Sequence, residues 1–204
     1  MIIDREDPGH RFRAHLPIGE TLPLPADGPH SWPIFPYEGE LRVRSLEAPE
    51  LPEPPRDGAA GAADCTQCAR PDDEFLWTDE HWRLCTYDVP NGLPAVLLLQ
   101  PRAHHDLLDL PPARAAELGP MLQRVEAAIL ALGGIGRVHV NRWGDGAAHL
   151  HFWLIARPEG QRQLLGSTLS LWMNVLPPLP DALRTETNHR IATTLATTGG
   201  TAHT

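Results

Sequence analysis

Apolar positions along the chain recur with two different periods, which predicts a domain of mixed strands and helices. Short runs rich in β-branched and aromatic residues predict strands, and these cover residues 75–77, 82–87, 95–100, 138–142 and 150–155. Apolar residues spaced by three or four predict the buried stripe of a helix over residues 112–132: Leu118, Met121, Leu122, Val125, Ile129 and Leu132. Further helices are expected over residues 160–175 and 181–196, followed by a loose tail from Thr197.

The strand predicted over residues 150–155 carries histidines on one face. Because side chains alternate along a strand, His149, His151 and Trp153 share a face. The opposite, core-facing side is formed by Leu150, Phe152 and Leu154. A glycine-rich turn over residues 144–146 precedes the strand and allows a ligand to approach backbone N–H groups. The alternative is that the histidines are ordinary surface residues of a half-covered sheet.

The first 60 residues are rich in proline, which interrupts long helices and central strands. Residues 40–46 alternate and predict one edge strand, and residues 52–63 have the composition of a linker. Either this region is a disordered tail, or residues 30–46 form an arm that packs through Trp32, Phe35 and Tyr37. The pattern divides the chain into an arm (1–60), a main domain (64–160) and a C-terminal helical extension (161–198).

Composition narrows the functional classes. The net charge of −9 argues against nucleic acid as a partner, and all 17 basic residues are arginine, which excludes Schiff-base lysine chemistry. No apolar run is long enough for a membrane span, and residues 1–13 lack the apolar core of a signal peptide. With three cysteines in the chain, we expect a cytoplasmic protein without a disulfide framework and without membrane association.

Cys65 and Cys68 form a Cys-x-x-Cys motif, which is typical of a metal site or of a redox pair. The redox interpretation expects a βαβ pattern around the motif, and here proline- and glycine-rich segments flank it instead. A zinc site needs two further ligands, for which His104 and His149 are candidates, with His105 as the substitute for His104. Cys85, within a predicted strand, is expected to be a buried hydrophobic residue.

In combination, these motifs resemble the histidine triad (HIT) superfamily, which includes nucleotide hydrolases and galactose-1-phosphate uridylyltransferase. The resemblance covers residues 64–160. It rests on an ordered series of motifs: Cys65-x-x-Cys68, Pro101-x-x-His104, a helix, Asn141, and Gly144-x-Gly146-x-x-His149-x-His151. It implies an α+β fold with a mainly antiparallel sheet and a packed helix. It also implies a structural zinc ion held by Cys65, Cys68, His104 and His149.

The resemblance further implies an enzyme, a nucleotidyl transferase or nucleotide hydrolase with His151 as the nucleophile. A neutral imidazole can attack phosphorus and form a phosphoramidate, and Asn141, Gly144 and Gly146 are expected to bind the phosphate. The expected ligand is a nucleotide or nucleotide sugar, and a homodimer is compatible with the resemblance.

Two residues depart from the pattern of the superfamily. Trp153 stands in place of the third strand histidine; it can donate one hydrogen bond but cannot carry a proton. Asp145 brings a carboxylate into the glycine-rich turn, where it repels phosphate unless it points away. Trp153 is therefore assigned to substrate binding rather than to proton transfer. The alternative function is a degenerate HIT domain that binds a nucleotide or a protein without catalysis.

Overall fold

The computed structural model describes residues 17–26 and 29–203, which form two compact units. The first unit includes the described residues up to 32 together with residues 37–54, and the second includes residues 33–36 and 55 onward. Residues 1–13, for which the sequence predicts no signal peptide, lie outside the described residues. No helix among the described residues is long and apolar enough to cross a membrane.

In the first unit, the prediction of an edge strand over residues 40–46 is wrong. Leu46 forms only an isolated parallel bridge with Ile18, and its carbonyl accepts a hydrogen bond from the N–H of Gly19 at 2.8 Å. The only helical element described there is a short 3-10 turn, η1 (Pro29–Ser31). Residues 40–46 contain no proline themselves, but the segment that Leu46 meets, residues 17–26, contains Pro17, Pro23 and Pro25. Each of these prolines removes a backbone donor that a strand ladder needs.

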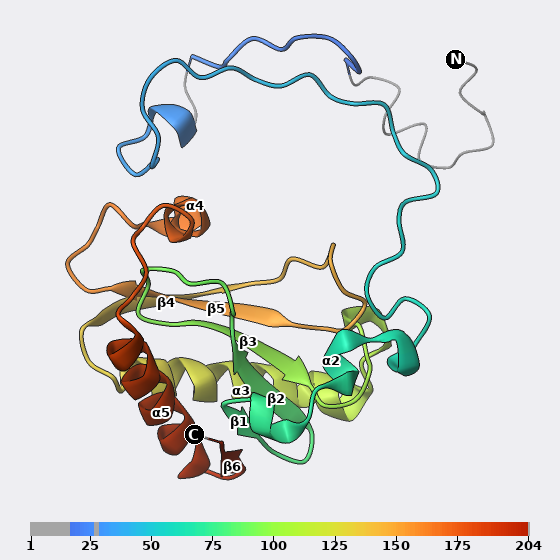
Figure 1. Ribbon diagram of the computed structural model, residues 1–204, viewed down its shortest axis with the longest axis vertical. Coiled ribbons are helices and arrows are strands. Elements are labelled where there is room, and N and C mark those ends of the chain that lie inside the picture. Colours follow the sequence, from blue (N-terminus) through green and yellow to red (C-terminus); the bar gives the residue numbers. More distant parts are fainter. Residues whose placement is uncertain (1–16, 27–28, 204) are drawn as a thin grey trace. The chain divides into compact units, whose positions relative to one another are not determined.

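The second unit is built on a six-stranded antiparallel sheet with the order β4-β5-β3-β2-β1-β6 (Figure 1). The strands are β1 (Trp77–Thr78), β2 (Trp82–Thr86), β3 (Val96–Pro101), β4 (Ile135–Asn141), β5 (Phe152–Pro158) and β6 (Thr201–Ala202). The helices are α2 (Thr66–Ala69), α3 (Pro112–Leu130), α4 (Leu169–Met173) and α5 (Asp181–Ala196). Short 3-10 turns η2 (Ala62–Asp64), η3 (Asp72–Glu74), η4 (Leu107–Asp109) and η5 (Gly166–Thr168) connect them. The predicted α+β fold with an antiparallel sheet is confirmed.

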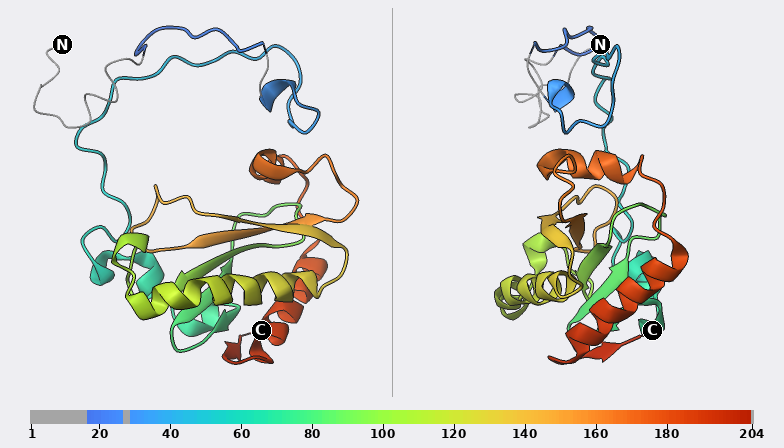
Figure 2. Two further views of the ribbon diagram at one scale, coloured as in Figure 1. Left: turned by 180° about the vertical axis from the view of Figure 1, so that it is seen from behind. Right: turned by 90° about the vertical axis from the view of Figure 1, so that its left-hand side faces the viewer.

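Helices cover both faces of this sheet (Figure 2). Helices α3 and α5 pack on one face, where Leu154 and Ala156 of β5 join the main core, and the predicted stripe of α3 faces this core. On the other face, Ile155 packs in a second apolar cluster with Leu169 and Met173 of α4. The strand alternation was therefore predicted correctly, and the face that carries Trp153 is partly covered by α4.

Several predicted boundaries are wrong, including the start of β4, which lies at Ile135 and not at residue 138. Strand β5 starts at Phe152, so His149 and His151 lie just before the strand. The helix expected over residues 160–175 shrinks to η5 and α4. The tail from Thr197 is not loose, because β6 pairs with β1 and the Trp77 indole donates to the carbonyl of Gly199 at 3.0 Å.

Part of the proline-rich region belongs to the second unit. The carbonyl of Ile34 accepts hydrogen bonds from the Trp172 indole at 2.7 Å and from the Thr168 hydroxyl at 3.0 Å. Residues 33–36 are thus anchored to the α4 region. Packing of the whole arm through Trp32, Phe35 and Tyr37 stays a prediction, as does the division into arm, domain and extension.

Candidate functional site

The structure brings together Cys65, Cys68, His104 and His149, although they come from separate segments of the chain. Their sulfur and nitrogen atoms all lie within 4.8 Å of one another. Cys65 caps the N-terminus of α2 and Cys68 lies inside this helix, so one short turn presents both sulfurs. His104 follows β3, and His149 precedes β5. The four residues, here called the metal cluster, are the group that can hold a metal ion.

The distances within the metal cluster suit tetrahedral coordination. The Nδ1 atom of His149 lies 3.5 Å from the Sγ atom of Cys65 and 3.4 Å from that of Cys68. The Nδ1 atom of His104 lies 3.4 Å from the Sγ atom of Cys68. Usual zinc–sulfur and zinc–nitrogen bond lengths at a tetrahedral angle give a sulfur–nitrogen separation of about 3.5 Å. These three sulfur–nitrogen distances therefore fit a cation such as zinc.

His149 is held in the orientation that a ligand needs. Its Nε2 atom lies 2.8 Å from the carbonyl oxygen of Pro101. Because a carbonyl only accepts, Nε2 carries the hydrogen and the lone pair is on Nδ1, facing the sulfurs. His149 is 1% exposed. This burial is the main reason why the pKa of His149 is lowered. The alternative interpretation of His149 as an ordinary surface residue is wrong, because the chain turns it inward before β5 begins.

The surroundings of Cys68 oppose ionisation of its thiol, although the positive charge of Arg83 favours it. Burial, followed by the neighbouring Cys65, raises the pKa of Cys68 to about 11. A bound cation has the opposite effect, because it stabilises the thiolate. Cys85 lies outside the metal cluster and is 1% exposed, and burial raises its pKa to about 11. Its predicted role as a buried hydrophobic residue agrees with this environment.

His105, the proposed substitute for His104, lies outside the metal cluster. Its carbonyl accepts the N–H of Leu150 at 2.7 Å, which ties this segment to the approach of β5.

His151 is partly buried just before β5, and its ring is oriented by the backbone. Its Nδ1 atom lies 2.9 Å from the carbonyl oxygen of His149. The carbonyl can only accept, so Nδ1 is the donor, and in the neutral ring the lone pair is on Nε2. The backbone of one metal-cluster residue therefore selects the tautomer of the predicted nucleophile.

The glycine-rich turn is held by a segment that the sequence pattern left as a linker. Arg56 donates from Nη1 to the carbonyls of Gly144 at 2.9 Å and Ala147 at 3.2 Å. The N–H of Asp57 donates to the carbonyl of Gly146 at 3.1 Å, and its carbonyl accepts from Ala148 at 2.8 Å. Composition gave no signal for this pairing, which joins residues about ninety positions apart.

Asp106 connects the same segment to the residue after Asn141. It accepts from Arg56 at 2.8 Å and from Arg142 at 2.6 Å. Partial burial opposes its ionisation, but the backbone N–H of Leu107 and the two guanidinium groups outweigh this and lower the pKa of Asp106 to about 2. Two arginines share one carboxylate, so the group keeps a positive charge next to the turn.

Asn141 ends β4 directly opposite Trp153 of β5. The Trp153 ring packs between those of Tyr87 and Trp143, with centroid separations of 4.8 Å and 5.2 Å. It lies 6.4 Å from the ring of His151. Its buried indole nitrogen has no hydrogen-bond partner within the part of the chain that the structure describes. Asp145 is exposed on the turn.

No known family model matches the chain, and no curated protein matches its sequence. Among solved structures, the chain is similar to a hypothetical histidine triad nucleotide-binding protein from Sulfolobus tokodaii strain 7. That match has a TM-score of 0.49 and 19% identity, and covers 65% of this chain and 93% of the other. A Zn-bound histidine triad family protein from Mycobacterium smegmatis matches with a TM-score of 0.47, 21% identity and coverage of 68% and 97%. A uridylyltransferase matches with a TM-score of 0.44, 20% identity and coverage of 65% and 45%. These likenesses concern the fold alone.

Proposed function

We propose that the chain is a zinc-bearing nucleotidyl transferase or nucleotide hydrolase in which His151 is the nucleophile. The observation that carries this proposal is the hydrogen bond from His151 Nδ1 to the carbonyl of His149 at 2.9 Å. It fixes the tautomer that leaves the Nε2 lone pair available for attack. The order of the motifs, which resembles the HIT superfamily, supplies the nucleotide as the substrate class.

The proposed reaction has two displacements. In the first, the Nε2 lone pair of His151 attacks the α-phosphorus, and the bond from phosphorus to the leaving-group oxygen breaks with its electrons leaving on that oxygen. The hydrogen on Nδ1 stays bound to the carbonyl of His149 while the ring becomes positively charged. In the second, an oxygen of water, phosphate or a sugar phosphate attacks phosphorus, and any proton that this oxygen carries is released to solvent. The phosphorus–nitrogen electrons then return to Nε2.

The metal is proposed to be a structural zinc ion held by Cys65, Cys68, His104 and His149. Two sulfur and two nitrogen donors leave no open position for substrate. When bound, zinc fixes the geometry of the chain around His149 and supplies no reacting group. Its contribution to His151 is therefore positional, through the backbone carbonyl that His149 offers two residues before.

The phosphate is proposed to bind at Asn141, Gly144 and Gly146. In a trans peptide, the carbonyl and the next N–H point in opposite directions. The carbonyls of Gly144 and Gly146 point toward Arg56 and Asp57. The N–H groups of the next residues, Asp145 and Ala147, therefore point away from that segment. These two N–H groups, with the positive charge at Arg142, supply donors for an anion. Trp153 is proposed to contact the base or sugar of a nucleotide or nucleotide sugar.

A binding protein without catalysis is the second candidate. Trp153 supports it, because this ring packs between Tyr87 and Trp143 and has no acid–base function. In this alternative, the same turn holds a nucleotide, but His151 transfers nothing. A homodimer is compatible with both candidates.

Intact-protein mass spectrometry distinguishes the two candidates. We expect the parent protein to gain the mass of a nucleoside monophosphate less one water when incubated with a panel of nucleotides and nucleotide sugars. His151→Asn should form no adduct and keep its metal, whereas His81→Asn, which changes a histidine outside the metal cluster, should react normally. Trp153→His tests whether a third histidine increases hydrolysis. An adduct on His151→Asn contradicts the mechanism, and binding of nucleotide by the parent without any adduct or turnover favours the second candidate.

A further inference from the structure

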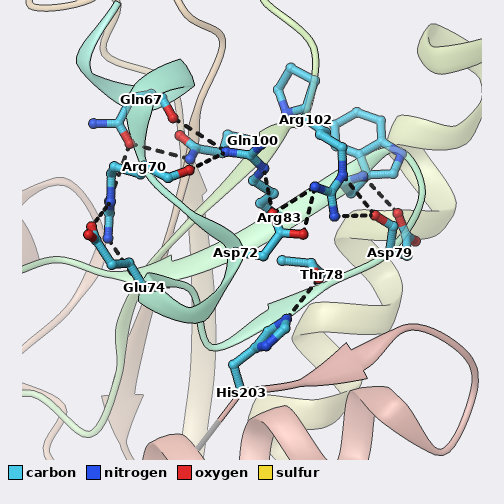
Figure 3. Close-up of polar contacts among 12 residues, drawn as sticks. Gln67, Arg70, Asp72, Glu74, Thr78, Asp79, Arg83, Gln100, Arg102 and His203 are labelled. Carbon is cyan, nitrogen blue, oxygen red and sulfur yellow. Dashed lines mark hydrogen bonds and ion pairs between the residues drawn. The ribbon is translucent and has the colours of Figure 1, made fainter.

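A group of charged side chains lies beside α2 (Figure 3), the helix that contains Cys68 of the metal cluster. Its most buried member is Arg83 of β2, which is 8% exposed. Arg83 donates from Nη1 to the carbonyl of Gln67 at 3.4 Å and to that of Arg70 at 3.3 Å. These carbonyls come shortly before and after Cys68 in the sequence. Arg83 therefore supports the turn that presents the two sulfurs.

A second arginine extends this group to the other side of the metal cluster. Arg102 follows β3 and lies two residues before His104. Its Nη1 atom donates to both carboxylate oxygens of Asp72, at 2.6 Å and 2.8 Å. Its Nε and Nη2 atoms donate to the carbonyl of Asp79 at 3.1 Å and 2.9 Å. Arg102 is thus fixed from two directions, and so is the start of the segment that carries His104.

Asp72 is the only described carboxylate that pairs with both arginines. It begins η3, four residues after Cys68, and lies 3.6 Å from the Nε atom of Arg83. The pKa of Asp72 is lowered, chiefly by the hydrogen bond from Arg102. Burial, and then the charge of Arg102, lowers the pKa of Arg83. Without Asp72, two neighbouring guanidinium groups would repel each other, and the buried one would have no counter-charge.

We infer that Asp72 is a positioning residue for the metal cluster. Through Arg83 it supports the turn that carries Cys65 and Cys68, and through Arg102 it holds that turn against the segment that carries His104. Asp72 touches no ligand atom and takes part in no reaction. This inference rests on the proposed zinc site and concerns how well that site is formed before the metal binds.

The test is the zinc affinity of Asp72→Asn, measured by competition with a chelator of known affinity. Asparagine keeps the shape of the side chain and removes its charge. Because residues that orient metal ligands typically contribute a factor of about 10–100 to affinity, we expect a loss of that size. The matched control is Asp73→Asn, which removes the adjacent exposed carboxylate and should bind zinc like the parent. Asp72→Glu should restore part of the affinity, since it keeps the charge.

Two further readouts distinguish a positioning role of Asp72 from a purely structural one. If Asp72 positions the ligands, Asp72→Asn should alter the visible absorption of the cobalt-substituted protein and lower the thermal midpoint more with zinc than without it. Equal zinc affinity in both asparagine variants, or an equal loss of thermal midpoint with and without zinc, would overturn the inference. If Asp72→Asn does not fold, Arg102→Lys gives the same comparison, because it keeps the charge and loses the two-oxygen contact. A parent protein that binds no zinc refutes the proposed metal site itself, and the inference with it.

Discussion

Gly58 offers a direct test of how tightly the chain closes over the metal cluster. It has a φ of +76°, in the left-handed region that favours glycine. A Cβ atom added at Gly58 would lie 2.8 Å from the Cε1 atom of His104, 2.9 Å from the Cβ atom of Cys65 and 3.2 Å from its Sγ atom. Gly58→Ala therefore forces two of the four metal-cluster residues apart or displaces the segment around Gly58.

The magnitude follows from two separate costs. An L-residue in the left-handed region costs about 1–2 kcal/mol. Overpacking against well-held side chains costs about 1–3 kcal/mol more. If the overpacking falls on the metal-bound form, where His104 and Cys65 cannot shift, the zinc affinity should fall by about 5- to 150-fold. We therefore expect Gly58→Ala to lose stability with and without zinc, and to lose more with it.

The control variant is Gly61→Ala. Gly61 has a φ of 117° and a ψ of −174°, which also disfavours a side chain, yet a Cβ atom there would meet nothing within 4 Å. This variant should lose about 1–3 kcal/mol through backbone strain and keep the zinc affinity of the parent. The assay is urea unfolding of each protein with zinc and with excess chelator, together with chelator competition for the affinity itself.

Equal zinc affinities in the parent, Gly58→Ala and Gly61→Ala would refute this reasoning. That result would mean that the segment around Gly58 does not close over Cys65 and His104 in solution. Equal losses of stability with zinc and with chelator in Gly58→Ala would leave only backbone strain as the cause.

Two further predictions concern the charges around the glycine-rich turn. Arg56→Met removes the hydrogen bonds to the carbonyls of Gly144 and Ala147. Amide hydrogen exchange should therefore become faster over residues 144–148, and nucleotide binding should weaken. The control Arg162→Met, at an exposed arginine, should change neither. The pKa of Asp106 falls from 3.8 to about 2 on folding, so its contribution, at most about 2 kcal/mol, is present above pH 4 and is lost as the pH falls toward 2. Acid unfolding of chelator-treated protein should show this loss of stability. Asp106→Asn should be less stable at pH 7 and should lose less stability between pH 4 and 2. The same acid profile in the variant and the parent would contradict the role given to Asp106.

Local patterns in the sequence were enough to predict much of the second unit. The spacing of Met121, Val125 and Ile129 predicted the buried side of α3, and the apolar run before Pro101 predicted β3. These predictions succeed because the helical and strand periods depend on neighbouring residues only. The Cys-x-x-Cys motif is equally local, since one turn of chain brings both sulfurs to the same side.

Contacts between distant segments were not readable from those periods. The sequence placed His149 within a strand, on the face opposite the core, whereas the fold turns it inward before β5 onto Pro101 and the two sulfurs. It left Arg56 and Gly58 in a linker, although Arg56 binds the turn at Gly144 and Gly58 packs on Cys65. Composition indicates that such a segment lacks periodic structure. It does not indicate which part of the protein pairs with the backbone N–H and carbonyl groups of the segment.

The sequence by itself determined which residue types are available for the chemistry and the order in which the chain presents them: two thiols in one turn, imidazoles at His104, His149 and His151, and no lysine. Only the tertiary structure decided that four of these side chains come within 4.8 Å of one another. It also decided that the Nε2 atom of His149 faces the carbonyl of Pro101, which leaves its Nδ1 atom facing the sulfurs. The physical reason is that donor spacing across distant segments depends on strand register, close packing and shared counter-charges such as Asp72, which arise only when the whole sheet and its covering helices assemble.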